Sequence, residues 1–213
     1  VAAAFGVTAA ADRMELGYLT LIPLTAGTMF DIAAVSGLHV HDTFYNVDGI
    51  TADPATVGFV LATTTEFANF DRNYIWVDGA QGPWVRASGI IKGLSISNFE
   101  IYLEAGTWAA AINLGGVGRA DSRIGPGTIS GGGTALTNLV LIADKTTDTA
   151  AGFCHGIRSN SIGPAAGALI GPTTDVASYA LTDCWRAVTI DAAQPTFTSG
   201  GNISWESGVP YTG

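Results

Sequence analysis

The sequence predicts an all-β chain built as a solenoid, and three observations lead to this prediction. Apolar and polar residues alternate through residues 94–103, and the alternation changes phase at Asn98. A similar short pattern recurs further along the chain. Many short apolar runs, separated by Gly-rich turns, follow residue 93.

The change of phase at Asn98 indicates a bend between two strands. Leu94 and Ile96 share one parity before Asn98, whereas Phe99 and Ile101 share the opposite parity after it. A straight strand would expose one of these apolar pairs, because a shift of one residue turns side chains to the other face. Asn tolerates the left-handed backbone that a one-residue corner requires. We therefore expect a new strand to begin after Asn98.

The pattern of an apolar residue, a hydroxyl residue, Asn or Asp, and a second apolar residue occurs three times. It predicts corners at Asn98, Asn138 and Asp183, and a weaker corner is expected at Asn160. The three full copies are about 40 and 45 residues apart. If one further corner lies between each pair, the repeat is roughly 20 to 23 residues, a length typical of solenoids. An antiparallel β-sandwich or jelly roll is the alternative fold, because it also contains many short strands.

The composition favours a structural protein and argues against a nucleic-acid partner and against a membrane span. Of 213 residues only 13% are charged, 28 are Gly, and the net charge is −9. The basic residues are scattered singly, which disfavours binding to a nucleic-acid backbone. The longest uncharged run, 124–143, contains Pro126 and several glycines, so we expect no membrane-spanning helix.

An aromatic cluster gives the candidate binding residues Tyr74, Trp76 and Trp84, which lie near turn residues rich in Gly and Pro. Exposed rings beside Asp and Asn could stack on the apolar face of a sugar. Packing in the core or in an interface between subunits explains the same cluster, because Trp and Tyr are enriched in both places. All three interpretations stay open at this point.

Two histidines, His39 and His41, lie on one face of an expected strand. Such a pair can share a metal ion, and it is also part of the cupin pattern. That pattern requires a Glu where this chain has Tyr45 and Asn46. We therefore expect two surface or packed imidazoles, with no metal and no cofactor.

The two cysteines, Cys154 and Cys184, leave their own alternatives open. A disulfide is possible if the protein is extracellular, and two buried thiols fit the sequence at least as well.

The chain from about residue 70 to residue 206 resembles a right-handed parallel β-helix, through its Asn corners. This is the architecture of pectin-degrading enzymes and of bacteriophage tailspikes and related surface proteins. The segment from Cys154 to Ile157 is similar to the His-Gly segment of polygalacturonases, which makes His155 a further candidate binding residue. The paired aspartates and the Arg-x-Lys motif of those enzymes are missing, so we expect no catalytic residues.

Two regions are expected, with residues 1–45 as an N-terminal cap or assembly arm and residues 46–213 as the β-helical domain. The Ala-rich residues 1–16 predict a short helix, and the following apolar residues predict a strand interrupted by Pro23. A solenoid has an open apolar end that must be covered, which suits a cap. An arm that reaches a neighbouring subunit is the alternative.

Together these observations predict a non-catalytic structural subunit of an extracellular or virion assembly, such as a capsid decoration, spike, fibre or surface filament. Its expected partners are further copies of itself, as a trimer or polymer, and other virion or surface-layer proteins. The alternative is a β-helix that binds or cleaves a glycan.

Overall fold

The computed structural model describes sixteen stretches of the chain, and every statement below concerns these residues. They are residues 5–7, 12–23, 27–33, 35–47, 56–61, 65–78, 81–87, 91–105, 107–113, 120–131, 135–141, 151–155, 157–159, 168–170, 178–182 and 197–199. Side chains are described between residues 12 and 131 only, and not for every residue there.

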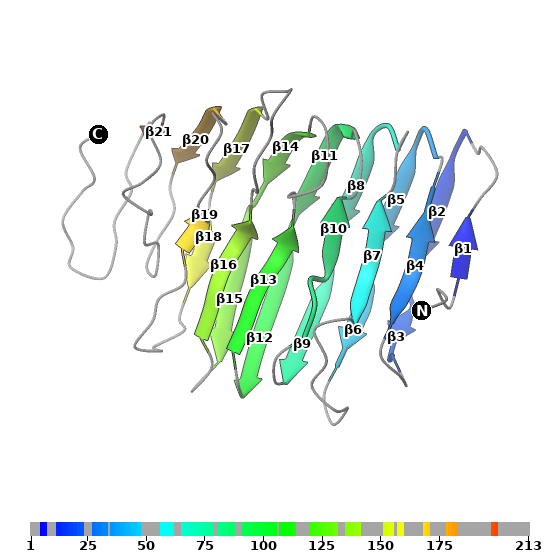
Figure 1. The fold of residues 1–213 in the computed structure, drawn as a ribbon, viewed down its shortest axis with the longest axis horizontal. Helices are drawn as coiled ribbons and strands as arrows, with labels where there is room; N and C mark the ends of the chain where they lie inside the picture. The colour runs from blue at the N-terminus through cyan, green and yellow to red at the C-terminus, as the bar shows by residue number, and fades with distance from the viewer. Residues whose placement is uncertain are drawn as a thin grey trace.

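The regular elements of the described residues are strands, which form three sheets (Figure 1). The seven-stranded sheet holds, in spatial order, β1 (Phe5–Val7), β4 (Thr28–Ile32), β7 (Val57–Leu61), β10 (Val85–Ala87), β13 (Thr107–Asn113), β16 (Ala135–Leu141) and β19 (Ala168–Ile170). The eight-stranded sheet holds β2 (Met14–Gly17), β5 (Leu38–His41), β8 (Ala68–Asp71), β11 (Ile91–Ser97), β14 (Ala120–Ile124), β17 (Ala151–His155), β20 (Ser178–Thr182) and β21 (Phe197–Ser199). The six-stranded sheet holds β18 (Ile157–Ser159), β15 (Gly127–Gly131), β12 (Phe99–Ala105), β9 (Tyr74–Asp78), β6 (Phe44–Asn46) and β3 (Thr20–Leu21).

The strands are stacked as a parallel β-solenoid. Over most of the chain, successive strands join the three sheets in turn, and each strand pairs in parallel with the strand one coil away, as β11 does with β8 and β14. The solenoid that the sequence predicts is therefore confirmed, and the antiparallel sandwich is wrong because the described pairings are parallel. The right-handed winding stays a prediction.

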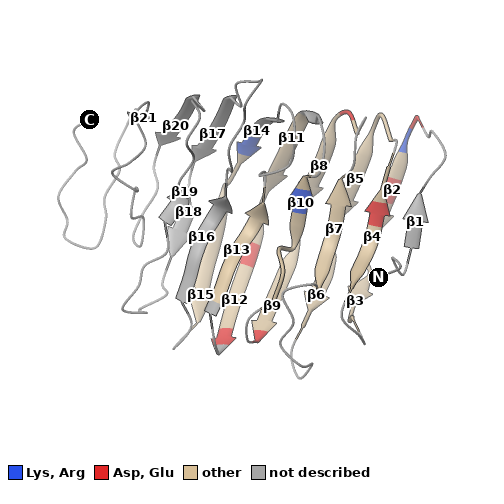
Figure 2. Ribbon diagram, viewed as in Figure 1, with Lys and Arg blue, Asp and Glu red and all other residues tan. Residues whose placement is uncertain are grey.

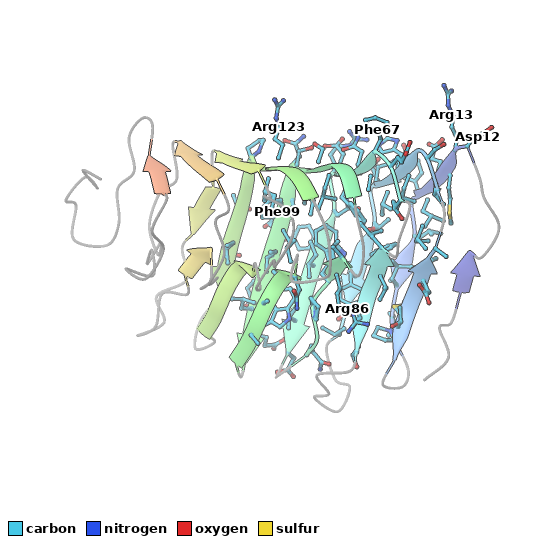
Figure 3. The ribbon with its side chains drawn as sticks, turned by 45° about the horizontal axis from the view of Figure 1, so that its top comes forward. Asp12, Arg13, Phe67, Arg86, Phe99 and Arg123 are labelled. Carbon is cyan, nitrogen blue, oxygen red and sulfur yellow. The ribbon has the colours of Figure 1, made fainter. Side chains whose placement is uncertain are left out.

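The core lies between the three sheets and is filled by stacked apolar side chains. The rings of Phe30 and Phe59 are stacked and nearly parallel, with centroids 4.9 Å apart, and the ring of Phe70 meets Phe59 edge-on. Trp84 extends this stack, with its ring 5.4 Å from that of Phe70. Figure 3 shows Phe99 directed into the same interior. Each such buried side chain contributes on the order of 1.5–3 kcal/mol by its removal from water.

The corner between the eight-stranded and six-stranded sheets is made by one residue with a left-handed backbone. Asn98 occupies this position between β11 and β12, with a φ of 51°. Because the chain bends there, the buried residues Leu94 and Ile96 before it and Phe99 after it all face the core despite their opposite parity. The same position in the other coils, here called the left-handed corner, holds Tyr18, Asp42, Arg72 and Gly125, all with positive φ.

Asn138 does not form a corner. It lies inside β16, with Ala110 of β13 and Ala168 of β19 as its register partners, so the strand continues through it. Asn160 and Asp183 lie outside the described residues. Since Asn138 does not mark the corner, the expected period was too short. Register partners across β2, β5, β8 and β11 are 24 to 30 residues apart. Hydrogen bonds between neighbouring coils, such as Ser36 to Asp12 and Arg72 to Asp42, span the same separations.

The described residues near the N-terminus are strands, so the helix expected in residues 1–16 is wrong for the parts that the structure describes, which include β1 and the start of β2. β3 ends at Leu21, two residues before Pro23. Strands β1 to β6 belong to the same three sheets as the rest of the chain, and no change of sheet accompanies the expected boundary at residue 45. The role of residues 1–45 as a cap or arm stays a prediction.

Side chains of the left-handed corner bond from coil to coil. Arg72 donates to both carboxylate oxygens of Asp42, at 2.9 and 2.8 Å, and it also pairs with Asp71. Asp71 in turn accepts hydrogen bonds from Ser97, at 3.0 Å, and from the Asn98 amide, at 2.8 Å. A polar chain therefore runs along this edge of the solenoid, parallel to the stack of coils.

We predict that Asn98→Ala destabilises the protein by about 1–2 kcal/mol, because alanine tolerates the left-handed backbone poorly and cannot bond Asp71. Asn98→Gly loses the same hydrogen bond but accepts the backbone, so its loss should be smaller. Urea unfolding followed by circular dichroism measures both. Ser95→Ala, on the outer face of β11, is the control and should change stability little. Equal losses for Ala and Gly would contradict the importance of the backbone conformation.

Candidate functional site

The outer face of the six-stranded sheet carries the most distinctive side chains that the structure describes. Strand residues alternate between the core and the surface, so every second residue of β6, β9 and β12 points outward. Four of these outward residues are aromatic, and they come from three adjacent coils. We call the following set the aromatic face: Phe44, Tyr74, Trp76 and Tyr102, with the carboxylates Glu100 and Glu104.

The sequence of β9 explains how two of these rings reach the surface. Ile75 and Val77 are fully buried, so Tyr74 and Trp76 must point to the other side of the strand. Tyr74 is 41% exposed. Parallel pairing in register then sets each ring beside a residue of the next coil. Phe44 and Glu100 flank Tyr74, and Tyr102 flanks Trp76.

The rings contact one another edge to face. The centroids of Trp76 and Tyr102 are 5.0 Å apart at an interplanar angle of 62°, and those of Phe44 and Tyr74 are 5.9 Å apart at 77°. Such contacts contribute about 0.5–1.5 kcal/mol each beyond the burial of area. The four rings therefore form an ordered surface, because each of them is held by a neighbour in an adjacent coil.

Two carboxylates hold the polar ends of the rings. The Tyr74 hydroxyl donates to Glu100 at 2.8 Å, and the Trp76 indole N–H donates to Glu104 at 2.6 Å. The hydrogen bond to Glu100 raises the pKa of Tyr74 above its ordinary value of 10.0, with smaller contributions from partial burial and from the Glu100 charge. Each pair joins an aromatic ring and a hydrogen-bond acceptor at a fixed distance.

The charge of this face is negative. Figure 2 shows acidic residues on β9 and β12. The strand arginines whose side chains the structure describes lie on β10 and β14, in the other two sheets. A ligand or partner that meets the aromatic face therefore meets hydrogen-bond acceptors and negative charge rather than cations.

Of the four binding residues that the sequence suggested, the structure brings together two, Tyr74 and Trp76. Trp84 is fully buried, so it belongs to the core and cannot stack on a ligand. His155 lies on β17 in the eight-stranded sheet, and its side chain is outside the described ones. The surface interpretation is thus wrong for Trp84. This residue precedes β10, where the alternation of the strand does not hold, and its ring packs against Phe70 in the core.

Sequence reasoning missed Phe44, Tyr102 and the two glutamates of the aromatic face. Glu100, Tyr102 and Glu104 alternate with the buried Ile101 and Leu103, so the parity of β12 could have placed them on the surface. Their contact with β9 could not be found in the same way, because it depends on the length of the coil.

No family model, curated protein or solved structure matches this chain. In the described parts of the structure, no helix is long and apolar enough to cross a bilayer.

We predict that Glu100→Ala lowers the pKa of Tyr74 toward 10.0, because the mutation removes the acceptor that stabilises the protonated hydroxyl. The stabilisation that this bond gives to the fold is complete below the unfolded pKa and is lost as the pH rises through the raised folded pKa. Tyrosinate absorbance, with Tyr74→Phe as the reference to subtract, measures the shift. Glu104→Ala should leave it unchanged, since Glu104 bonds Trp76. A titration of Tyr74 that is identical with and without Glu100 would contradict the assignment.

Proposed function

We propose that this protein is a non-catalytic structural subunit of an extracellular or virion assembly, and that it acts through contacts between copies of itself. The aromatic face is the proposed contact surface. Bacteriophage tailspikes and related right-handed β-helical surface proteins are the class within this fold to which we assign it. Other proteins of the same virion or surface layer are its further partners.

The single observation that supports this proposal best is the ordered row of rings on the outer sheet face. Tyr and Trp are enriched at the centres of protein interfaces, where they contribute much of the binding energy. Tyr74 is 41% exposed and already oriented by Glu100, so little side-chain entropy is lost on contact. The flat face of a parallel sheet also offers a broad surface for lateral association.

The composition supports the same class. The chain carries few charges and a net charge of −9, which suits an exposed surface protein and gives a nucleic-acid backbone no basic patch to bind. We infer an extracellular or virion-surface location from this combination of composition and solenoid fold.

Glycan binding is the second candidate, and the ring–carboxylate pairs favour it specifically. A pyranose offers an apolar face that can stack on Tyr74 or Trp76 and hydroxyls that can donate to Glu100 or Glu104. Cleavage of the glycan is the weaker form of this candidate. Glycoside hydrolysis requires two positioned carboxyl groups, and both glutamates here hold ring donors.

We predict that the wild-type protein sediments as a trimer or larger polymer, and that the double variant Tyr74→Ser and Tyr102→Ser weakens association at least about tenfold. Analytical ultracentrifugation over a range of concentrations measures this. Phe67→Asn is a matched control because Phe67 is also an exposed aromatic residue, 64% exposed, but lies outside the aromatic face. Since Phe67 has a φ of 53°, Asn suits its backbone.

A monomeric wild-type protein would contradict the assembly proposal. Binding of that monomer to a neutral or acidic polysaccharide, lost in the Tyr74→Ser and Tyr102→Ser variant and kept in Phe67→Asn, would support the second candidate instead. Release of reducing ends from the polysaccharide would contradict the non-catalytic assignment.

A further inference from the structure

The first two coils carry a cluster of metal-ligating side chains on the outer face of the eight-stranded sheet. We propose that Glu15, His39 and His41 bind one divalent transition-metal ion, with Zn²⁺ as the best fit. One ligand atom of each residue lies within 4.8 Å of the others. This inference is independent of the aromatic face, and it differs from the expectation that the two histidines serve only as surface or packed imidazoles.

Strand pairing brings the three residues together. Glu15 of β2 and His39 of β5 are register partners, so their side chains lie side by side on the outer face. His41 follows two residues later on the same strand and points the same way. The ring centroids of His39 and His41 are 4.5 Å apart. Two imidazoles and one carboxylate on two hydrogen-bonded strands therefore converge without any long loop.

Gly17 makes room for the ring of His41. A β-carbon at Gly17 would lie 2.4 Å from Cε1 and 2.6 Å from Nε2 of His41, so any other residue would displace the imidazole. His41 as a whole is only 6% exposed, and Tyr18 contacts its ring edge-on with centroids 5.4 Å apart. His41 is thus a held group rather than a mobile surface side chain.

Asp42 orients His41 in the way that carboxylates orient metal-binding histidines. Asp42 Oδ2 is 2.8 Å from Nδ1 of His41, and Arg72 fixes the carboxylate of Asp42 with two hydrogen bonds. When Nδ1 donates to Asp42, Nε2 keeps its lone pair for a metal ion. That nitrogen is hydrogen-bonded to Glu15 Oε1 at 2.8 Å. A tetrahedral ion would replace this bond and separate the two atoms to about 3.4 Å, a small movement for the exposed Glu15 side chain.

The chemistry of the three ligands selects the metal. Imidazole nitrogen suits Zn²⁺ and its transition-metal neighbours, whereas Mg²⁺ and Ca²⁺ prefer sites made of oxygen alone. Two histidines and one glutamate leave a fourth tetrahedral position for water or another ligand.

An open groove of about 530 Å³ adjoins two of the three proposed ligands. Glu15 and His39 line it, together with Arg13, Phe67 and Asn69. Figure 3 shows Arg13 pointing out from the same edge of the solenoid. A cationic residue at the groove favours water or a small anion, such as a carboxylate, as the fourth ligand.

Calorimetric titration of the metal-free protein with ZnCl₂ tests the site. We expect one Zn²⁺ per chain with micromolar or tighter affinity, and affinity at least tenfold weaker in His39→Asn and in Glu15→Gln. These two residues are more exposed than His41, so their replacement should spare the fold. Asp31→Asn is the matched control, since Asp31 is an exposed acid on β4 of the seven-stranded sheet, and it should bind Zn²⁺ as the wild type does.

Asp42→Asn tests the positioning role of Asp42. Asn suits the left-handed backbone of residue 42, where φ is 50°, so the corner should persist. We expect one ion per chain with affinity about 10–100-fold weaker, and an altered visible absorption spectrum of bound Co²⁺. A merely structural role of Asp42 would leave that spectrum unchanged.

The thermal midpoint gives a second readout. Zn²⁺ should raise it in the wild type and in Asp31→Asn, and should raise it less in His39→Asn and Glu15→Gln. Absence of binding to the wild type at millimolar Zn²⁺, or equal affinity in the wild type, His39→Asn and Glu15→Gln, would overturn the proposal. The proposal would also be overturned if Zn²⁺ did not raise the midpoint of the wild type. Any loss of stability in the metal-free variants would then reflect a structural role of these side chains alone.

Discussion

The structure depends on one backbone constraint, the residue with positive φ that joins the eight-stranded sheet to the six-stranded sheet in the five coils where this corner is described. This residue turns the chain within a single position and reverses the parity of the buried side chains, as Leu94 and Phe99 show on either side of Asn98. Parity after the corner decides that Tyr74 and Trp76 face outward, and parity before it decides the same for His39 and His41. The corner therefore determines which side chains face outward both in the aromatic face and in the proposed metal site.

The corner carries its own electrostatics, because its side chains lie above one another in successive coils. Arg72 bonds Asp42 one coil away, and the hydrogen bonds from Arg72 and His41 hold the pKa of Asp42 below its usual range. Burial raises the pKa of Asp71, but hydrogen bonds from Asn98 and Ser97 and the Arg72 charge outweigh this effect and lower it. Exposed ion pairs contribute about 0–1 kcal/mol each. The polar contacts at the corner therefore orient side chains more than they stabilise the fold.

The sequence predicted the solenoid because a phase change at a residue tolerant of positive φ has a direct structural meaning. It did not predict the other corners, since Tyr18 and Arg72 adopt the same backbone without any compositional signal, and it proposed Asn138, which β16 passes through. Because the expected coil was too short, part of the aromatic face was missed. Tyr74 and Trp76 were found by their type, whereas their neighbour Tyr102 is found only once the strands are in register.

Gly17 has a consequence for how this chain can vary. The imidazole of His41 occupies the volume that a side chain at residue 17 would need, so the two positions are coupled by simple exclusion. Proteins descended from the same ancestor should keep glycine at the first position whenever they keep histidine at the second, and should acquire larger residues there only after the histidine has been lost. This pairwise covariation would appear in aligned sequences even if Glu15 had drifted to another amino acid.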